Sequence, residues 1–109
     1  MAQDFRRYTQ NNVGTGAALV FTSDSYDTVI GIHVSNILPS ASITVDVYVN
    51  DGAQDIYLVK SAPIPQGSSL QILDGGAKMV VHSGDVMYVK SDTASSADVW
   101  VSTVDAISI

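Results

Sequence analysis

The chain has no cysteine and no glutamate, and both absences limit what it can form. Without cysteine, disulfides and thiolate metal sites are excluded. All eleven acidic residues are Asp, which favours turns because its carboxylate accepts hydrogen bonds from nearby backbone N–H groups. Glu, a good helix former, is missing, and only 15% of the residues are charged, so few residues remain to solvate a helical face. We therefore expect no substantial helix.

Basic residues are also scarce. Five Lys and Arg stand against eleven Asp, which gives a net charge of −6 at pH 7. A nucleic-acid surface needs clustered Lys or Arg to neutralise phosphates, so we expect no nucleic-acid partner. The segment Met1–Tyr8 has no apolar run behind its charges and lacks the pattern of a signal peptide. No aliphatic run approaches the ~20 residues of a membrane-spanning helix, and we expect no membrane partner.

The chain does have a repeated alternation with a period of two. Ile43–Val49 reads Ile-Thr-Val-Asp-Val-Tyr-Val, which places its β-branched aliphatic residues on one face of a strand. The pattern recurs between turn signals spaced about 8–12 residues apart, which is typical of a sandwich. We predict a single all-β domain over residues 1–109, an antiparallel β-sandwich that is jelly-roll-like. Its predicted strands are Phe5–Asn11, Ala17–Thr22, Thr28–Ser35, Ile43–Val49, Asp55–Ser61, Ser69–Leu73, Lys78–His82, Val86–Ser91 and Asp98–Ile107.

Three local details carry separate expectations. Ile56–Val59 is apolar without a gap, which predicts a strand that is covered on both faces. Pro63 and Pro65 predict an extended linker after that strand, since each disfavours helix at the preceding residue. The alternation of the last strand slips around Thr103 and Val104, which predicts a β-bulge there.

No reactive constellation stands out. His33 and His82 lack a second metal ligand at a favoured spacing, so we interpret both as residues of a sheet face or rim. Gly14–Gly16 lacks the Lys-Ser/Thr pair of a phosphate-binding loop, and no Gly-x-Ser-x-Gly element is present. We therefore expect no enzyme, with no catalytic residue, no metal and no cofactor.

The Asp residues leave one alternative open. Asp51 with Asp55, and Asp74 with Asp85, would offer carboxylates to calcium if their loops converged at one end of the sandwich. A glycosidase also uses a carboxylate pair, but no spacing here singles one out. Asp-Gly turns explain each residue locally, and we favour this turn-forming role.

The aromatic residues are the candidates for a contact surface. Tyr48, Tyr57 and Trp100 lie out of phase with, or between, the aliphatic core positions, which predicts exposed rings. Such rings stack sugars in carbohydrate-binding modules, but Tyr and Trp also anchor protein interfaces. We favour a homo-oligomeric interface formed by these rings, with Phe5 and Tyr8 of the polar N-terminal strand reaching a neighbour. The alternative is a carbohydrate- or receptor-binding module with a surface glycan as its partner.

Six stretches together cover most of the chain: Ile43–Gly52, Tyr57–Leu70, Ser83–Ser91 and Ala94–Ser102, with Tyr8–Val13 and Val29–Asn36 similar in kind. They resemble small all-β virion structural proteins of tailed bacteriophages. The resemblance implies a head-decoration, neck or tail-associated subunit that is assembled in many copies in the host cytoplasm. Its implied partners are copies of itself and other virion proteins, and it carries over no catalytic or ligand residue.

Overall fold

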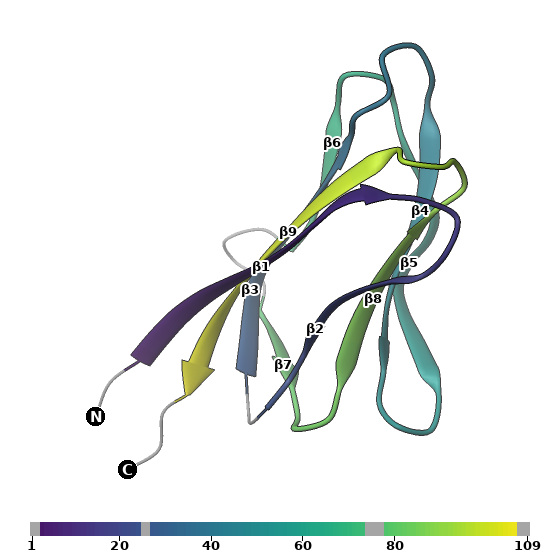
Figure 1. The fold of residues 1–109 in the computed structure, drawn as a ribbon. Coiled ribbons are helices and arrows are strands. Elements are labelled where there is room, and N and C mark those ends of the chain that lie inside the picture. The colour runs from purple at the N-terminus through teal and green to yellow at the C-terminus, as the bar shows by residue number, and fades with distance from the viewer. Residues whose placement is uncertain (1–2, 25–26, 74–77, 107–109) are drawn as a thin grey trace.

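The computed structural model of the protein describes residues 3–24, 27–73 and 78–106. These residues form nine strands and no helix, which confirms the all-β prediction (Figure 1). Each predicted strand is present with similar bounds, although the predicted end of the last one, Ile107, lies outside the described residues. The strands are β1 (Gln3–Val13), β2 (Ala18–Thr22), β3 (Asp27–Asn36), β4 (Ile43–Asn50), β5 (Asp55–Ile64), β6 (Ser69–Leu73), β7 (Met79–Val81), β8 (Val86–Ser91) and β9 (Ala97–Ala106).

The strands form two antiparallel sheets that pack face to face (Figure 1). In the first sheet the order is β1-β9-β3-β6, and β7 also pairs with β3. In the second sheet the order is β2-β8-β4-β5. The chain changes sheets at most of its connections, including those from β1 to β2 and from β8 to β9. The predicted antiparallel sandwich is confirmed.

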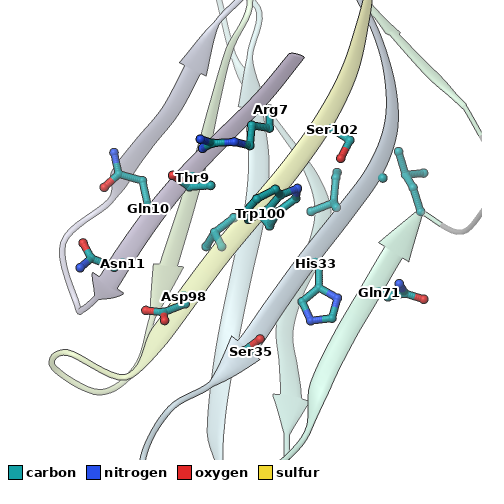
Figure 2. Close-up of a pocket in the computed structure, with 14 residues that line it drawn as sticks. Arg7, Thr9, Gln10, Asn11, His33, Ser35, Gln71, Asp98, Trp100 and Ser102 are labelled. Carbon is teal, nitrogen blue, oxygen red and sulfur yellow. The ribbon is translucent and has the colours of Figure 1, made fainter. Parts of the chain in front are cut away.

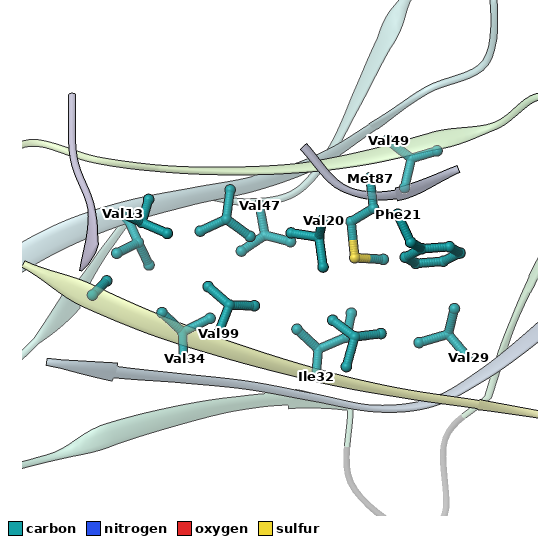
Figure 3. Packing of buried hydrophobic residues seen from close by; sticks show 14 of the residues in the cluster. Val13, Val20, Phe21, Val29, Ile32, Val34, Val47, Val49, Met87 and Val99 are labelled. Carbon is teal, nitrogen blue, oxygen red and sulfur yellow. The ribbon is translucent and has the colours of Figure 1, made fainter. Parts of the chain in front are cut away.

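The core lies between the sheets and consists mainly of β-branched side chains. In β4 the alternation is strict, because Val47 is 0% exposed while the next residue, Tyr48, keeps part of its surface. Figure 3 shows Val47 and Met87 of the second sheet opposite Val99 and other residues of the first. Each buried aliphatic side chain of this size contributes about 1.5–3 kcal/mol of transfer free energy, so the fold needs no disulfide.

The edge strand β5 differs from its prediction. Within the described part of the chain it pairs with β4 alone, and its Ile56 is 47% exposed, so the strand is not covered on both faces. Two register shifts against β4 place additional residues in β5. Ser61 lies at one of them with a φ of 54°, a backbone conformation typical of bulges. These irregularities interrupt the alternation, which explains the gapless apolar run from Ile56 to Val59.

The predicted linker at Pro63 is also wrong. Pro63 pairs with Thr44 within the sheet, and Ile64 is fully buried in the core. Proline cannot donate a ladder hydrogen bond, but an edge strand tolerates this loss because one side of its backbone has no partner strand. The edge position of β5 therefore reconciles proline with strand structure.

The predicted bulge in β9 lies in its partner strand instead. Thr103 is fully buried and Val104 half-buried, so β9 keeps its alternation through both residues. The register shift occurs in β3, where Val29 pairs with Thr103 and Gly31 with Ser102. The alternation only appeared to slip because the polar Thr103 lies on the inner face of β9 and the aliphatic Val104 on its outer face.

Candidate functional site

The residues predicted to form one interface lie on different parts of the fold. Trp100 lies on the outer face of the first sheet, whereas Tyr48 and Tyr57 lie on the outer face of the second sheet. Tyr8 packs against the core, and its ring stacks on Phe21 with centroids 4.7 Å apart. Phe5, in the edge strand β1, is 69% exposed. The rings thus form two separate surfaces, and Tyr8 belongs mainly to the packing between the sheets.

A row of large side chains crosses the outer face of the second sheet. Leu19 of β2 pairs with Tyr88 of β8, Tyr88 with Tyr48 of β4, and Tyr48 with Tyr57 of β5. The ring centroid of Tyr48 lies 5.3 Å from that of Tyr88 and 4.9 Å from that of Tyr57. We call these four side chains the tyrosine row. Cross-strand pairs of this kind stabilise a sheet by about 0.2–1 kcal/mol each.

The tyrosine row is uncharged but lies among charged groups. Burial, followed by the nearby Asp55 carboxylate, raises the pKa of the Tyr48 phenol above its usual value. The phenol therefore stays neutral at physiological pH. The Lys60 ammonium lies 4.4 Å from the ring centroid of Tyr57 and 4.0 Å from a carboxylate oxygen of Asp46. The two ends of the row, Leu19 and Tyr57, remain 46% and 41% exposed.

The outer face of the first sheet has a groove of about 850 Å³, which Figure 2 shows with its lining side chains. One row of pairs crosses its floor: Thr9 of β1 pairs with Trp100 of β9, Trp100 with His33 of β3, and His33 with Gln71 of β6. The alternation of each strand directs these side chains outward. Residues from four strands therefore converge on one surface.

Trp100 is the main apolar group of this groove. The Arg7 guanidinium lies 5.2 Å from the ring centroid, a cation–π contact. Trp100 as a whole nevertheless remains 49% exposed. Beside it, Gly31 pairs with Ser102, and a Cβ at Gly31 would have no heavy atom within 4 Å. The groove is open at this point because Gly31 has no side chain.

The two histidines are separate in the fold. His33 lies in the groove, whereas His82 follows β7, which pairs with the Asp27–Val29 end of β3. His33 lies six positions after Asp27 along β3, which corresponds to roughly 20 Å at about 3.3 Å per residue. Among the residues that the structure describes, no three His, Cys, Asp or Glu side chains form a group suited to a metal ion.

Three of the four Asp residues considered as calcium ligands serve turns. The Asp51 carboxylate accepts hydrogen bonds from the backbone N–H groups of Ala53 and Gln54, both at 3.0 Å, and these bonds lower the pKa of Asp51. Asp55 accepts a bond from the Asn50 side-chain amide. Asp85 accepts one from the backbone N–H of His82. The predicted turn-forming role is confirmed for these three carboxylates, while Asp74 lies outside the described residues.

Parts of both surfaces are not predicted from the sequence. Tyr88 alternates with Met87 and Val89, so the period of two already places it on an outer face. Its alignment with Tyr48 depends on the pairing of β8 with β4, which a local pattern does not contain. The same holds for His33 and Gln71, which become neighbours of Trp100 only through the order of the first sheet.

Comparisons with known proteins show that the chain shares its fold with a solved structure. No protein-family model and no curated protein matches the chain. A solved structure described as "Bacillus endospore appendages form a novel family of disulfide-linked pili" is similar to it, with a TM-score of 0.56 and 14% identity over 98% of this chain and 88% of that chain. At this identity the similarity concerns the fold alone. The neighbour is a pilus protein and not a phage protein.

No helix among the described residues has the length and apolar character needed to cross a membrane.

Proposed function

We propose that the chain is a structural subunit that assembles with copies of itself and performs no catalysis. The observation that carries this proposal is the tyrosine row, which crosses all four strands of the second sheet and leaves its ends exposed. Tyr side chains offer a large apolar area at low entropic cost and are enriched where interfaces gain most of their energy. A row of large side chains with exposed ends suits a subunit that is covered by its neighbour.

The contact is expected to use this face rather than the open edges of the second sheet. At one edge, β5 has two register shifts and Pro63 in its ladder. Bulges and proline hinder the addition of a further strand. At the other edge, β2 has only five residues. The row therefore provides a more continuous contact surface than either edge strand.

The fold similarity to a pilus protein is compatible with this role. That pilus is described as disulfide-linked, whereas the present chain has no cysteine, so disulfides do not link the assembly proposed here. For the setting, we propose a tailed-phage virion with other virion proteins as further partners, on the strength of the sequence resemblance. Assembly in the host cytoplasm follows from that setting.

The experiment changes the exposed ends of the row and measures the mass in solution. We expect Leu19→Ser together with Tyr57→Ser to weaken self-association at least about tenfold, since both side chains lie on the proposed contact. The control is Val80→Ser, because Val80 of β7 is 64% exposed and belongs to the first sheet. Equal self-association of the double variant and the control would contradict the proposal.

A further inference from the structure

We propose that the groove on the outer face of the first sheet binds a neutral oligosaccharide, with the indole of Trp100 as the surface on which a sugar ring stacks. This inference goes beyond the proposed structural role. It concerns the opposite face of the sandwich from the tyrosine row. It can therefore fail or succeed independently of self-association.

The position of Trp100 provides the apolar contact. Outward positions of β9 otherwise hold polar residues near the groove, namely Asp98 and Ser102. A half-exposed indole between them leaves apolar area in water, which is unfavourable by about 25 cal/mol per Å². One face of a sugar ring presents C–H groups that can cover this area. Because Trp100 remains 49% exposed beside Arg7, surface is left for a second contact.

The polar lining matches hydroxyl groups. Thr9, Gln71 and His33 lie in the same cross-strand row as Trp100 (Figure 2). Hydroxyl and amide side chains both donate and accept hydrogen bonds, as the hydroxyls of a sugar do. Among the lining residues that the structure describes, Arg7 is the one Lys or Arg side chain and Asp98 the one carboxylate. Their charges are opposite, and this balance favours a neutral ligand over an anionic one.

Two other occupants fit this surface less well. An extended peptide binds a sheet by adding to a free edge, but β9 and β3 at the floor of the groove each have strand partners on both sides. A ligand in the groove must therefore be recognised by side chains and not by backbone hydrogen bonds. A protein partner usually anchors an apolar side chain in an apolar pocket, whereas Trp100 is here surrounded by polar side chains. The volume of about 850 Å³ falls within the roughly 300–1,000 Å³ of small-molecule sites.

Gly31 offers a way to close the groove without removing a contact. A Cβ at this position has no heavy atom within 4 Å, and its φ is not in the left-handed region. Gly31→Leu therefore adds a side chain beside Trp100 without a backbone clash. Gly16 has the same open surroundings but lies outside the residues that line the groove. Gly16→Leu is the matched control.

The test uses the full chain on immobilised oligosaccharides of glucose, mannose, galactose and N-acetylglucosamine, two to six units long. Sulfated and sialylated oligosaccharides serve as charged comparisons, and calorimetry then gives the affinity for any oligosaccharide that binds. We expect binding to at least one neutral oligosaccharide. Trp100→Ala and Gly31→Leu should each weaken it at least about tenfold. Gly16→Leu and Val80→Ala should leave it unchanged.

Three results would overturn the proposal: no binding to any neutral oligosaccharide on the surface, binding to the charged ones only, or binding that survives Gly31→Leu. Thermal unfolding of every variant accompanies the measurement. If Trp100→Ala fails to fold, Gly31→Leu decides the outcome, because it removes no side chain from the native structure.

Discussion

The rings of Tyr48 and Tyr88 face each other across β4 and β8 with their centroids 5.3 Å apart and their planes at 22°. Both residues come from strands whose alternate positions build the core, so the same period that buries Val47 and Val89 places the two rings outside. Each ring also has a partner on its other side, Leu19 beside Tyr88 and Tyr57 beside Tyr48. Packing of the core and formation of the proposed contact surface thus follow from one pattern.

Removing the central ring should weaken the sheet. Tyr48→Ala loses contacts with both neighbouring rings, and we expect a loss of about 1–2 kcal/mol in the free energy of unfolding. Tyr48→Phe keeps the ring contacts and should cost less than about 0.5 kcal/mol. Urea unfolding of both variants measures the difference. Equal stability of the Ala and Phe variants would show that the ring contacts do not stabilise the fold.

The two ends of β5 should respond differently to the same substitution. Ile64 is 0% exposed and Ile56 is 47% exposed. We expect Ile64→Ala to cost about 2–5 kcal/mol, since it leaves a cavity between the sheets. Ile56→Ala at the exposed end should cost less than about 1 kcal/mol. A similar cost for both substitutions, measured by urea unfolding, would contradict the described position of β5.

Asn36 should be sensitive to the loss of its side-chain amide. This buried amide donates hydrogen bonds to the backbone carbonyls of Ala41 and Ile64, and its oxygen accepts one from the N–H of Leu38. Asn36→Leu leaves these backbone groups without their partner, and we expect a loss of about 2–4 kcal/mol. Thermal and urea unfolding check this value. A variant as stable as the wild type would show that water replaces the amide at no cost.

Acid should destabilise the protein through Asp92. The backbone N–H of Thr44 donates to its carboxylate, and this bond lowers the pKa of Asp92 below the usual 3.8. A lowered pKa in the folded state gives stability that is present above about pH 4 and is lost as the pH falls through the folded-state value. Asp92→Asn should therefore flatten the fall of Tm between pH 4 and pH 2. An unchanged profile would exclude this carboxylate as a cause.

The sequence predicts the strands well because their signal is local. The alternation in Ile43–Val49 depends only on neighbouring residues, and β4 follows it. Errors arose where a distant strand decides the outcome. The register shifts of β5 depend on β4, and the irregularity near Thr103 lies in β3. A local pattern contains neither relationship.

The same holds for the candidate surfaces: features set by neighbouring residues are predicted correctly, and features set by a distant strand are not. The period of two correctly directs Tyr48 and Trp100 away from the core, but it does not say which sheet each strand joins. Because β4 and β9 belong to different sheets, the two rings lie on opposite faces. Tyr8 was predicted to reach a neighbouring subunit, but its ring packs against Phe21. This contact depends on β1 lying over β2 across the sandwich, which a local pattern does not contain.

The molar mass of the unmodified protein in solution tests the central claim most directly. Light scattering over a wide range of concentrations, at low and at physiological ionic strength, should give a mass that rises with concentration above that of the 11.5 kDa chain. The rise should persist at the higher ionic strength, because the tyrosine row is uncharged. A mass that stays at that of one chain under all these conditions would contradict the proposed self-assembly.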